Sequence, residues 1–213
     1  IAQDQHMQEA FTSGMDIHTA TAAQVFHVAP EDVTPLMRRH AKAVNFGIVY
    51  GIGAHSLSQD IGVSYSEAKT YIDEYLAHYS HVAAFMDRLI AEAKEKGYAL
   101  TLFGRRRPLP ELRASNGVTR AFGERVARNM PIQGTAADII KRAMIRVYRR
   151  LQEEGLQARL ILQVHDELIV EAPQNEADRV STLLKEEMEG AAELSVKLSV
   201  DVHTGDTWYD AKG

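Results

Sequence analysis

The sequence predicts an α+β fold that is mostly helical at first and ends in helices packed on a small antiparallel sheet. Apolar residues recur at helical spacing through most of residues 3–154, and short β-prone segments follow between residues 159 and 203. A length of 213 residues accommodates one domain or two closely packed subdomains. Helices packed against a small antiparallel sheet are typical of this class.

Proline and glycine residues mark the ends of the expected helices. Pro35 suits a first helical turn, whereas Gly51 and Gly97 each end a helix. Pro131 predicts a kink or break, because proline lacks an amide donor and clashes with the preceding turn. Residues 98–103 form a short expected strand, with a turn at Gly104 and the following arginine run. The expected helices span residues 3–13, 16–27, 35–50, 66–79, 81–96, 117–129 and 132–154.

The last third changes character. Residues 159–164 and 167–171 are apolar and β-prone, and a two-residue turn at His165 and Asp166 makes them a predicted hairpin. Residues 174–192 form an expected amphipathic helix. Apolar and polar residues then alternate over residues 196–203, which predicts a third, half-buried strand.

Composition excludes several functions. The sequence has no cysteine, which rules out disulfides, thiolate metal sites and cysteine nucleophiles. No apolar run approaches the ~18 residues that cross a bilayer, so we expect no membrane association. The chain opens at Ile1 without a signal-peptide pattern, and we expect it to be a piece of a longer protein.

The charge is unevenly distributed. The formal net charge is −5, yet residues 101–150 contain twelve Lys and Arg against three acidic residues, a local charge of +9. A local field of this sign attracts polyanions such as nucleic acids. A set of solvated helix faces would produce the same count, so this feature alone leaves both interpretations open.

One expected helix combines cations with aromatic rings. Arg38, Lys42, Phe46 and Tyr50 are spaced by four, and each step drifts only ~40° around an α-helix, so they share a face. Cations bind phosphates and aromatic faces stack on bases, so the stripe suits a nucleoside triphosphate. The alternative places both rings in the core and both cations in solvent.

Two further patterns are polar. Asp166 and Glu167 lie at the hairpin turn, where carboxylates suit Mg²⁺, although a simple polar hairpin tip has the same composition. Arg125, Asn129 and Gln133 are again four apart, and such side chains can contact base or sugar edges in a shallow groove. Polar surface residues around a kink are the alternative.

Together and in this order, these segments resemble the C-terminal polymerase region of family A DNA polymerases, the bacterial DNA polymerase I type. The resemblance covers essentially the whole chain. The matching segments are DIHTATA at 16–22, RRHAKAVNFGIVYG at 38–51, residues 117–141 with NMPIQGTAAD at 129–138, QVHDEL at 163–168 and GDTWY at 205–209.

The resemblance implies a division into subdomains and a set of nucleotide-binding residues. Residues 1–15 would be a palm remnant, 16–105 the fingers and 106–213 the palm. His18, Arg38 and Lys42 would approach the triphosphate of the incoming dNTP, with Lys42 also donating a proton to the leaving pyrophosphate. Phe46 would stack on the sugar and base, and Tyr50 would lie near the templating position.

The resemblance also implies DNA and metal contacts. Arg125, Asn129 and Gln133 would touch primer and template in the minor groove, and His165 would lie near the primer terminus. Asp166 would bind catalytic Mg²⁺, of which the complete enzyme holds two ions, and Glu167 beside it is a further catalytic candidate.

The implied parent protein is a template-directed DNA polymerase of DNA replication and repair. It would transfer a nucleotide from a dNTP to a primer 3′-OH in the bacterial cytoplasm, at the nucleoid. The family's other aspartate motif is not found here. We therefore expect one palm strand and the thumb to be missing, an isolated chain that is inactive, and an N-terminal remainder as partner. The alternative is a non-catalytic nucleic-acid or nucleotide binding module.

Overall fold

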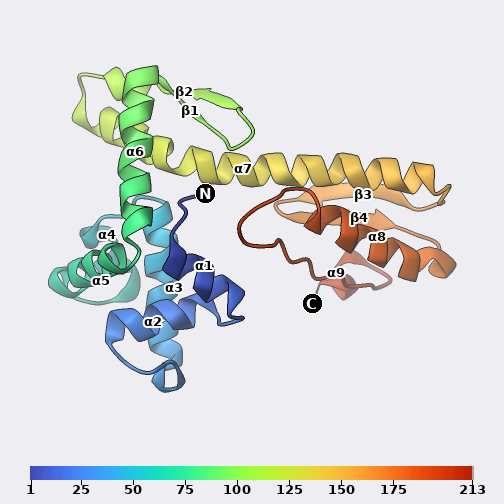
Figure 1. The fold of residues 1–213 in the computed structure, drawn as a ribbon, viewed down its shortest axis with the longest axis horizontal. Helices are drawn as coiled ribbons and strands as arrows, with labels where there is room; N and C mark the ends of the chain where they lie inside the picture. The colour runs from blue at the N-terminus through green and yellow to red at the C-terminus, as the bar shows by residue number, and fades with distance from the viewer. Residues whose placement is uncertain (213) are drawn as a thin grey trace. The chain divides into compact units, whose positions relative to one another are not determined.

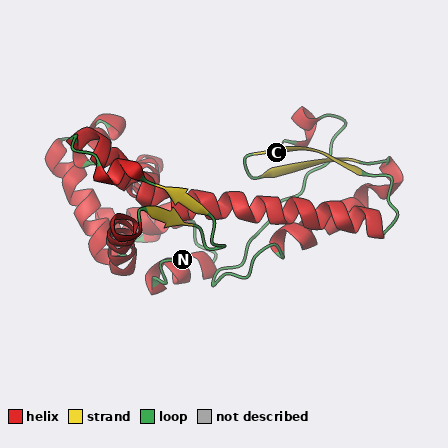
Figure 2. Ribbon diagram, turned by 90° about the horizontal axis from the view of Figure 1, so that it is seen from above, coloured by secondary structure: helices red, strands yellow, loops and turns green. Residues whose placement is uncertain are grey.

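The computed structural model describes residues 1–212, and its fold is α+β, as the sequence predicts (Figure 1). The chain forms two compact units. Unit 1 is Ile1–Ile132, and unit 2 begins at Gln133. Helices predominate in both units (Figure 2). Within residues 1–212, no helix is both long enough and apolar enough to cross a membrane.

Unit 1 is a helical assembly with one small hairpin. Two short 3₁₀ turns, Pro30–Asp32 and Pro110–Arg113, join its larger elements. The larger elements are α1 (Gln5–Thr12), α2 (Ile17–Phe26), α3 (Pro35–Val49), α4 (Ala54–Ile61), α5 (Tyr65–His78), α6 (Ser80–Lys96), β1 (Tyr98–Leu100), β2 (Arg106–Pro108) and the first part of α7 (Gly117–Glu153).

Side-chain caps fix where several helices of unit 1 begin. A cap satisfies amide donors that have no partner within the helix. Asp16 and Thr34 cap α2 and α3 in this way. Asp4 caps α1 and also accepts a hydrogen bond from the His81 amide at 3.1 Å, which ties α1 to the start of α6.

The main core of unit 1 lies between α3, α4, α5 and α6. It includes the fully buried Val44 and Leu57 and the nearly buried Tyr75 and Tyr79. Leu57 belongs to α4, a helix that the sequence analysis did not predict. A pair of glycines precedes α4 and Gly62 ends it in the left-handed conformation, so only eight residues carry the helical pattern.

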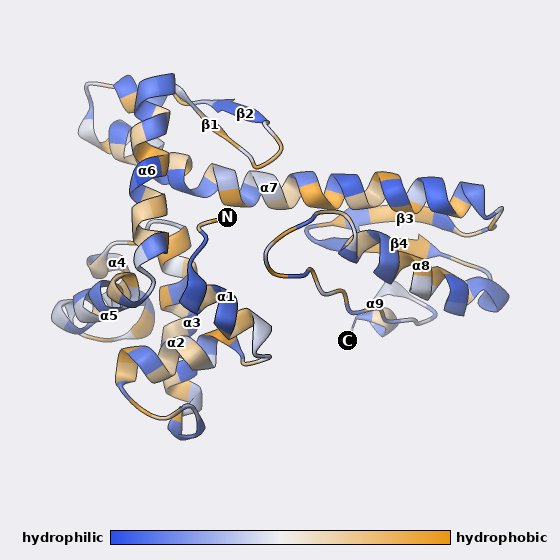
Figure 3. Cartoon of the chain, in the orientation of Figure 1, coloured by the Kyte–Doolittle hydropathy of each residue, from blue (hydrophilic) through white to orange (hydrophobic). Residues whose placement is uncertain are grey.

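Unit 2 packs α8 (Ala177–Glu189) and the second part of α7 around a hairpin. The strands are β3 (Arg159–Val164) and β4 (Glu167–Glu171), which pair antiparallel. β3 is largely apolar (Figure 3). The core of unit 2 includes Val147 and Leu151 from α7 and Val180 and Leu183 from α8. The short helix α9 is Trp208–Ala211.

The predicted hairpin in unit 2 is confirmed. Val164 pairs with Glu167, which leaves His165 and Asp166 as the two turn residues. His165 adopts a left-handed conformation with φ of 51°. Two-residue hairpin turns require positive φ at such positions, because only then does the turn match the twist of the strands.

The predicted strand at residues 196–203 is wrong. Val196, Leu198, Val200 and Val202 are half-buried and their neighbours are exposed, so the alternation does correspond to burial. A strand also needs a ladder partner, and within residues 1–212 the ladders are β1 with β2 and β3 with β4. The Val200 amide donates instead to the Glu189 carboxylate at 3.1 Å.

Two other predictions need correction. The break at Pro131 does not occur, because α7 runs unbroken through it from Gly117 to Glu153. Met130 packs in one apolar cluster and Ile132 packs against another. This packing holds the segment helical although Pro131 has no amide donor. The arginine run is not wholly a turn, since Arg106 and Arg107 lie in β2 and pair with Leu100 and Ala99.

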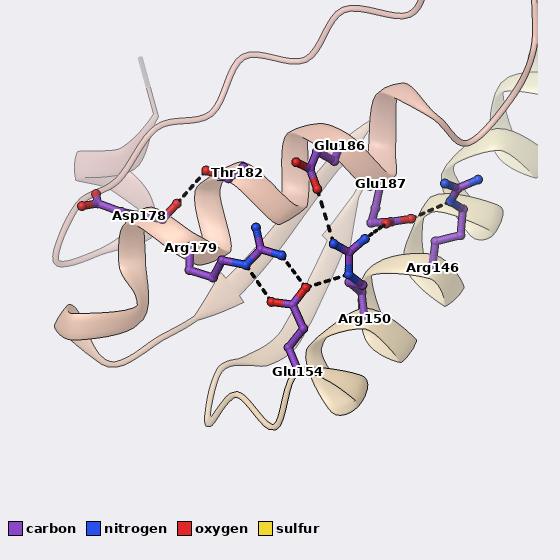
Figure 4. A network of polar contacts seen from close by, with 8 residues as sticks. All are labelled: Arg146, Arg150, Glu154, Asp178, Arg179, Thr182, Glu186 and Glu187. Atoms are coloured by element: carbon purple, nitrogen blue, oxygen red, sulfur yellow. Dashed lines mark hydrogen bonds and ion pairs between the residues drawn. The ribbon is translucent and has the colours of Figure 1, made fainter.

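A chain of ion pairs fastens α8 to α7 (Figure 4). The Glu187 side chain is only 11% exposed and accepts hydrogen bonds from Arg146 at 2.7 Å and Arg150 at 2.8 Å. Arg150 also donates to Glu154 at 2.6 Å, and Arg179 completes the network on the same carboxylate. Removing Glu187 would therefore take one carboxylate partner from each of two guanidinium groups.

We expect Glu187→Ala to lower the free energy of unfolding by about 1–3 kcal/mol, because a nearly buried charged acceptor is lost. Glu186→Ala is the matched control, since its carboxylate is half exposed and lies 3.6 Å from Arg150. It should change stability by less than about 0.5 kcal/mol. Urea unfolding of both variants makes the comparison, and equal effects would contradict the assignment.

We expect Gly47→Ala to destabilise unit 1, although alanine normally favours helices. A Cβ at Gly47 would lie 2.4 Å from Cγ2 of Ile52, which packs on the core. Such overpacking costs about 1–3 kcal/mol. Gly117→Ala is the control, because its Cβ would meet only the Arg120 guanidinium at 3.9 Å. Thermal unfolding should show a lower midpoint temperature for Gly47→Ala. The midpoint temperature of Gly117→Ala should be unchanged.

Candidate functional site

Helix α3 divides its residues between core and solvent. Ala41, Val44 and Ile48 are buried. Phe46 and Tyr50 are each 48% exposed, so the alternative that placed these rings in the core is wrong. Lys42 is exposed as well, with its Nζ atom 5.9 Å from the centre of the Phe46 ring. The cation and the aromatic rings of the stripe thus form one accessible face.

Arg38, the first member of the stripe, is held by Asp16 from the start of α2. Its Nε and one terminal nitrogen donate to the two carboxylate oxygens, each at 2.9 Å. Asp16 also accepts from the Thr19 amide at 2.8 Å, so one carboxylate both caps α2 and orients the guanidinium. The hydrogen bond from Arg38 is the main reason why the pKa of Asp16 lies well below its usual range.

His18 lies in the first turn of α2 and faces the same stripe. Its ring is half-buried, with its centre 5.7 Å from that of Phe46. Partial burial lowers the pKa of His18, the charge of Asp16 opposes this, and Arg38 and Lys42 lower it further. The imidazole is therefore neutral at pH 7 and acts through a single N–H donor.

A pocket of about 520 Å³ opens at the C-terminal end of the stripe. Phe46 and Tyr50 line it together with Arg125 of α7. Gly51 has a φ of 70°, a conformation that favours glycine, and it lies beside Arg125, since a Cβ there would contact the Arg125 side chain at 3.4 Å. The structure thus brings one predicted DNA-contacting residue to the predicted nucleotide-binding stripe.

The other polar residues of α7 fall in both units. Arg125 and Asn129 belong to unit 1, and Gln133 is the first residue of unit 2. Within residues 1–212, the Asn129 Oδ1 atom and the Nε atom of the neighbouring Arg128 are buried without a hydrogen-bond partner. Such atoms are costly to leave unpaired, and an external ligand could supply the missing partners.

His165, Asp166 and Glu167 lie together at the exposed tip of the β3–β4 hairpin in unit 2. Mg²⁺ prefers oxygen ligands and usually takes only one or two protein carboxylates. Asp166 and Glu167 could therefore supply some of the ligands of one ion. Over residues 1–212, the structure gathers no group of three or more His, Asp or Glu side chains suited to a metal ion. A complete two-ion site would need oxygens beyond these two carboxylates.

Sequence reasoning missed two contributors to the unit 1 site. Asp16 was not recognised as the partner of Arg38, and Asn45 was not singled out. Asn45 lies between the buried Val44 and the exposed Phe46 and contacts His18. A polar residue beside the apolar positions of a helix was the available signal, although it does not reveal the partner.

Comparison with known proteins identifies the family. Residues 1–210 match the model of DNA polymerase family A. The chain is 56% identical to DNA polymerase I of Geobacillus stearothermophilus and 49% identical to the thermostable DNA polymerase I of Thermus thermophilus, in both cases over 212 residues. These alignments cover 100% of this chain but 24% and 25% of the relatives, so it spans about a quarter of their length.

A comparison with a solved structure supports the same family. The chain is similar to the POL domain of Pol1 from M. smegmatis in complex with DNA primer-template and dNTP, with a TM-score of 0.94 and 40% sequence identity. That comparison covers all of this chain and 37% of the other. The chain belongs to DNA polymerase family A.

We expect Asp16→Ala to destabilise unit 1 by about 1–2 kcal/mol, since it removes the α2 cap together with the partner of Arg38. Asp16→Asn should lower the free energy of unfolding less, because asparagine is an equally good cap. It removes only the charge that pairs with Arg38. Urea unfolding measures both. If the two variants were equally destabilised, the ion pair with Arg38 rather than the cap would carry the effect.

Proposed function

We propose that the protein to which this chain belongs is a template-directed DNA polymerase that extends a primer 3′-OH with dNTPs. The observation that carries the proposal is the accessible stripe of cations and aromatic rings on α3 in a chain of DNA polymerase family A. The similar POL domain, whose structure contains primer-template and dNTP, supports the same ligands here.

The α3 stripe would bind the incoming nucleotide. Arg38 can chelate two phosphate oxygens in the way it now holds the two oxygens of Asp16. Lys42 adds a point charge, and the neutral His18 ring adds one N–H donor. Phe46 packs on the sugar and base, and Tyr50 bounds the pocket where the templating base would lie.

Lys42 would also act in the chemical step. When the primer 3′-OH attacks the α-phosphorus, the bond to the pyrophosphate oxygen breaks and negative charge develops on the leaving group. An ammonium group beside the phosphates stabilises that charge and can donate a proton to it. The exposed position of Lys42 beside Phe46 is compatible with both roles.

Asp166 would hold Mg²⁺, with Glu167 beside it. When bound, the ions supply Lewis-acid stabilisation of the attacking and leaving oxygens. The hairpin tip leaves both side chains accessible to a metal ion with its water and phosphate ligands. His165 in the same turn would lie near the primer terminus.

The primer-template would contact α7 through Arg125, Asn129 and Gln133, in a chain region with a local charge of +9. The unsatisfied Asn129 Oδ1 supports a groove contact there. In this proposal residues 16–105 serve as fingers, and residues 1–15 and 106–213 contribute to the palm.

We expect Lys42→Ala, made in the complete polymerase, to slow single-turnover nucleotide addition by about 10²–10⁴-fold. DNA affinity should change far less, because Lys42 contacts the nucleotide and not the duplex. Rapid-quench primer extension with Mg²⁺ gives the rate, and a fluorescence titration of primer-template gives the affinity.

Lys69→Ala is the matched control for Lys42→Ala. Lys69 is an exposed lysine of α5 that pairs with Asp73, outside the proposed site. Its loss should leave the rate unchanged. Near-normal addition by Lys42→Ala would show that the triphosphate does not bind along this stripe, and a binding module without catalysis would then be the better interpretation.

A further inference from the structure

A line of polar side chains connects the core of unit 1 to His18. Thr21 of α2 is fully buried, and its hydroxyl donates to the Oδ1 atom of Asn45 at 3.1 Å. The Nδ2 atom of Asn45 lies 3.0 Å from Nδ1 of His18.

This arrangement fixes which nitrogen of His18 carries the proton. The Thr21 hydroxyl donates to the amide oxygen, so the Asn45 amide turns its NH₂ group toward the histidine. An NH₂ group can only donate, and therefore Nδ1 must accept with its lone pair. The neutral ring then carries its hydrogen on Nε2, and within the described residues that nitrogen has no hydrogen-bond partner.

The tautomer decides how a neutral His18 meets a phosphate. With the hydrogen on Nε2, the ring donates to an anionic oxygen. In the other tautomer, Nε2 would present a lone pair and repel the same oxygen. The charged groups that act on the ring are Asp16 of its own helix end and Arg38 and Lys42 of α3. None of these selects a tautomer as directly as a hydrogen bond to Nδ1 does.

We propose that Asn45 is a positioning residue that holds His18 in its Nε2–H tautomer, so that the ring donates to the triphosphate of the incoming nucleotide. Thr21 in turn orients Asn45. This inference rests on the proposed function, since it takes the ligand at Arg38 and Lys42 to be a nucleoside triphosphate. It gives Asn45 a role in nucleotide affinity without any contact to the nucleotide.

The decisive variant is Asn45→Asp in the complete polymerase. The new carboxylate can only accept, so it reverses the hydrogen bond and draws the ring hydrogen to Nδ1. It also raises the pKa of His18. Below that pKa both ring nitrogens carry hydrogens and the donor to phosphate survives. Above it Nε2 loses its hydrogen, so nucleotide affinity should fall as pH rises.

The measurement is the KM for dNTP on a fixed primer-template between about pH 6 and pH 9, expressed at each pH relative to the unchanged enzyme. For Asn45→Asp the ratio should rise by about 5- to 30-fold over this range, which corresponds to one charge-assisted hydrogen bond. The kcat ratio should change less. Asn45→Leu, which has no polar group, should raise KM by a factor that does not depend on pH.

Two controls separate positioning from a general structural effect. The double variant His18→Gln with Asn45→Asp should lose the pH-dependent rise, because glutamine does not titrate. Thr21→Val should raise KM for dNTP. Thr21→Ser should leave KM close to that of the unchanged enzyme, because serine keeps the hydroxyl that orients Asn45.

A flat KM ratio for Asn45→Asp, or a pH-dependent rise that persists without His18, would overturn the inference. Lys42→Ala in the same assay separates this result from a failure of the proposed function. If Lys42→Ala slows nucleotide addition while Asn45→Asp has a flat profile, only the role of Asn45 is wrong. If neither has an effect, the triphosphate does not bind at this site.

Discussion

The packing of α2 against α3 is the interaction on which the candidate nucleotide site depends. Polar contacts join these helices at Arg38, which donates to Asp16, and at Asn45, which contacts both His18 and Thr21. Arg38 and Asn45 are seven residues apart, which is about two helical turns or roughly 10 Å along α3. The helices are therefore fixed at two points along this length, and neither can slide or rotate without breaking a hydrogen bond.

Asp16 contributes to stability in a pH-dependent way. Its pKa in the folded state lies below the ordinary value of 3.8, chiefly because Arg38 donates to it. A lowered carboxyl pKa gives a contribution that is fully present above the unfolded value, and it is lost as pH falls toward the folded value. The side chains of Asp16 and Arg38 are 42% and 46% exposed, so solvent screens the pair and the contribution is small. The pair therefore serves to orient Arg38 more than to hold the fold.

Features set by local spacing could be predicted from the sequence. The four-residue spacing of Arg38, Lys42, Phe46 and Tyr50 was enough to place them on one helix face, and the exposure of both rings agrees with a ligand-binding stripe. The hairpin turn at His165 and Asp166 followed from two short apolar segments separated by two residues. The family resemblance was also sound, since DNA polymerase family A is confirmed.

Features that depend on a distant partner could not be predicted. Alternation over residues 196–203 indicates which side chains are half-buried, but it does not supply a strand with which to pair. Pro131 weakens a helix locally, and only the tertiary packing of Met130 and Ile132 shows that the helix continues. The role of Asn45 depends on Thr21, which is 24 residues away in sequence. No local pattern joins those two positions.

The Asp16–Arg38 pair also bears on how a nucleotide would be received. A carboxylate and a phosphate both offer two oxygens to a guanidinium, so Arg38 is already in the geometry that it needs for a phosphate. Side-chain ordering, which costs free energy in any binding event, has therefore largely taken place before the ligand arrives.

Releasing Asp16 costs little, since both partners are partly exposed, and its carboxylate still accepts from the Thr19 amide and so still caps α2. In the proposed function, a triphosphate carries more charge than one carboxylate and would also interact with Lys42, which would favour exchange of Asp16 for phosphate. The same carboxylate thus keeps the guanidinium oriented in the free protein and can release it without unfolding the helix that it caps.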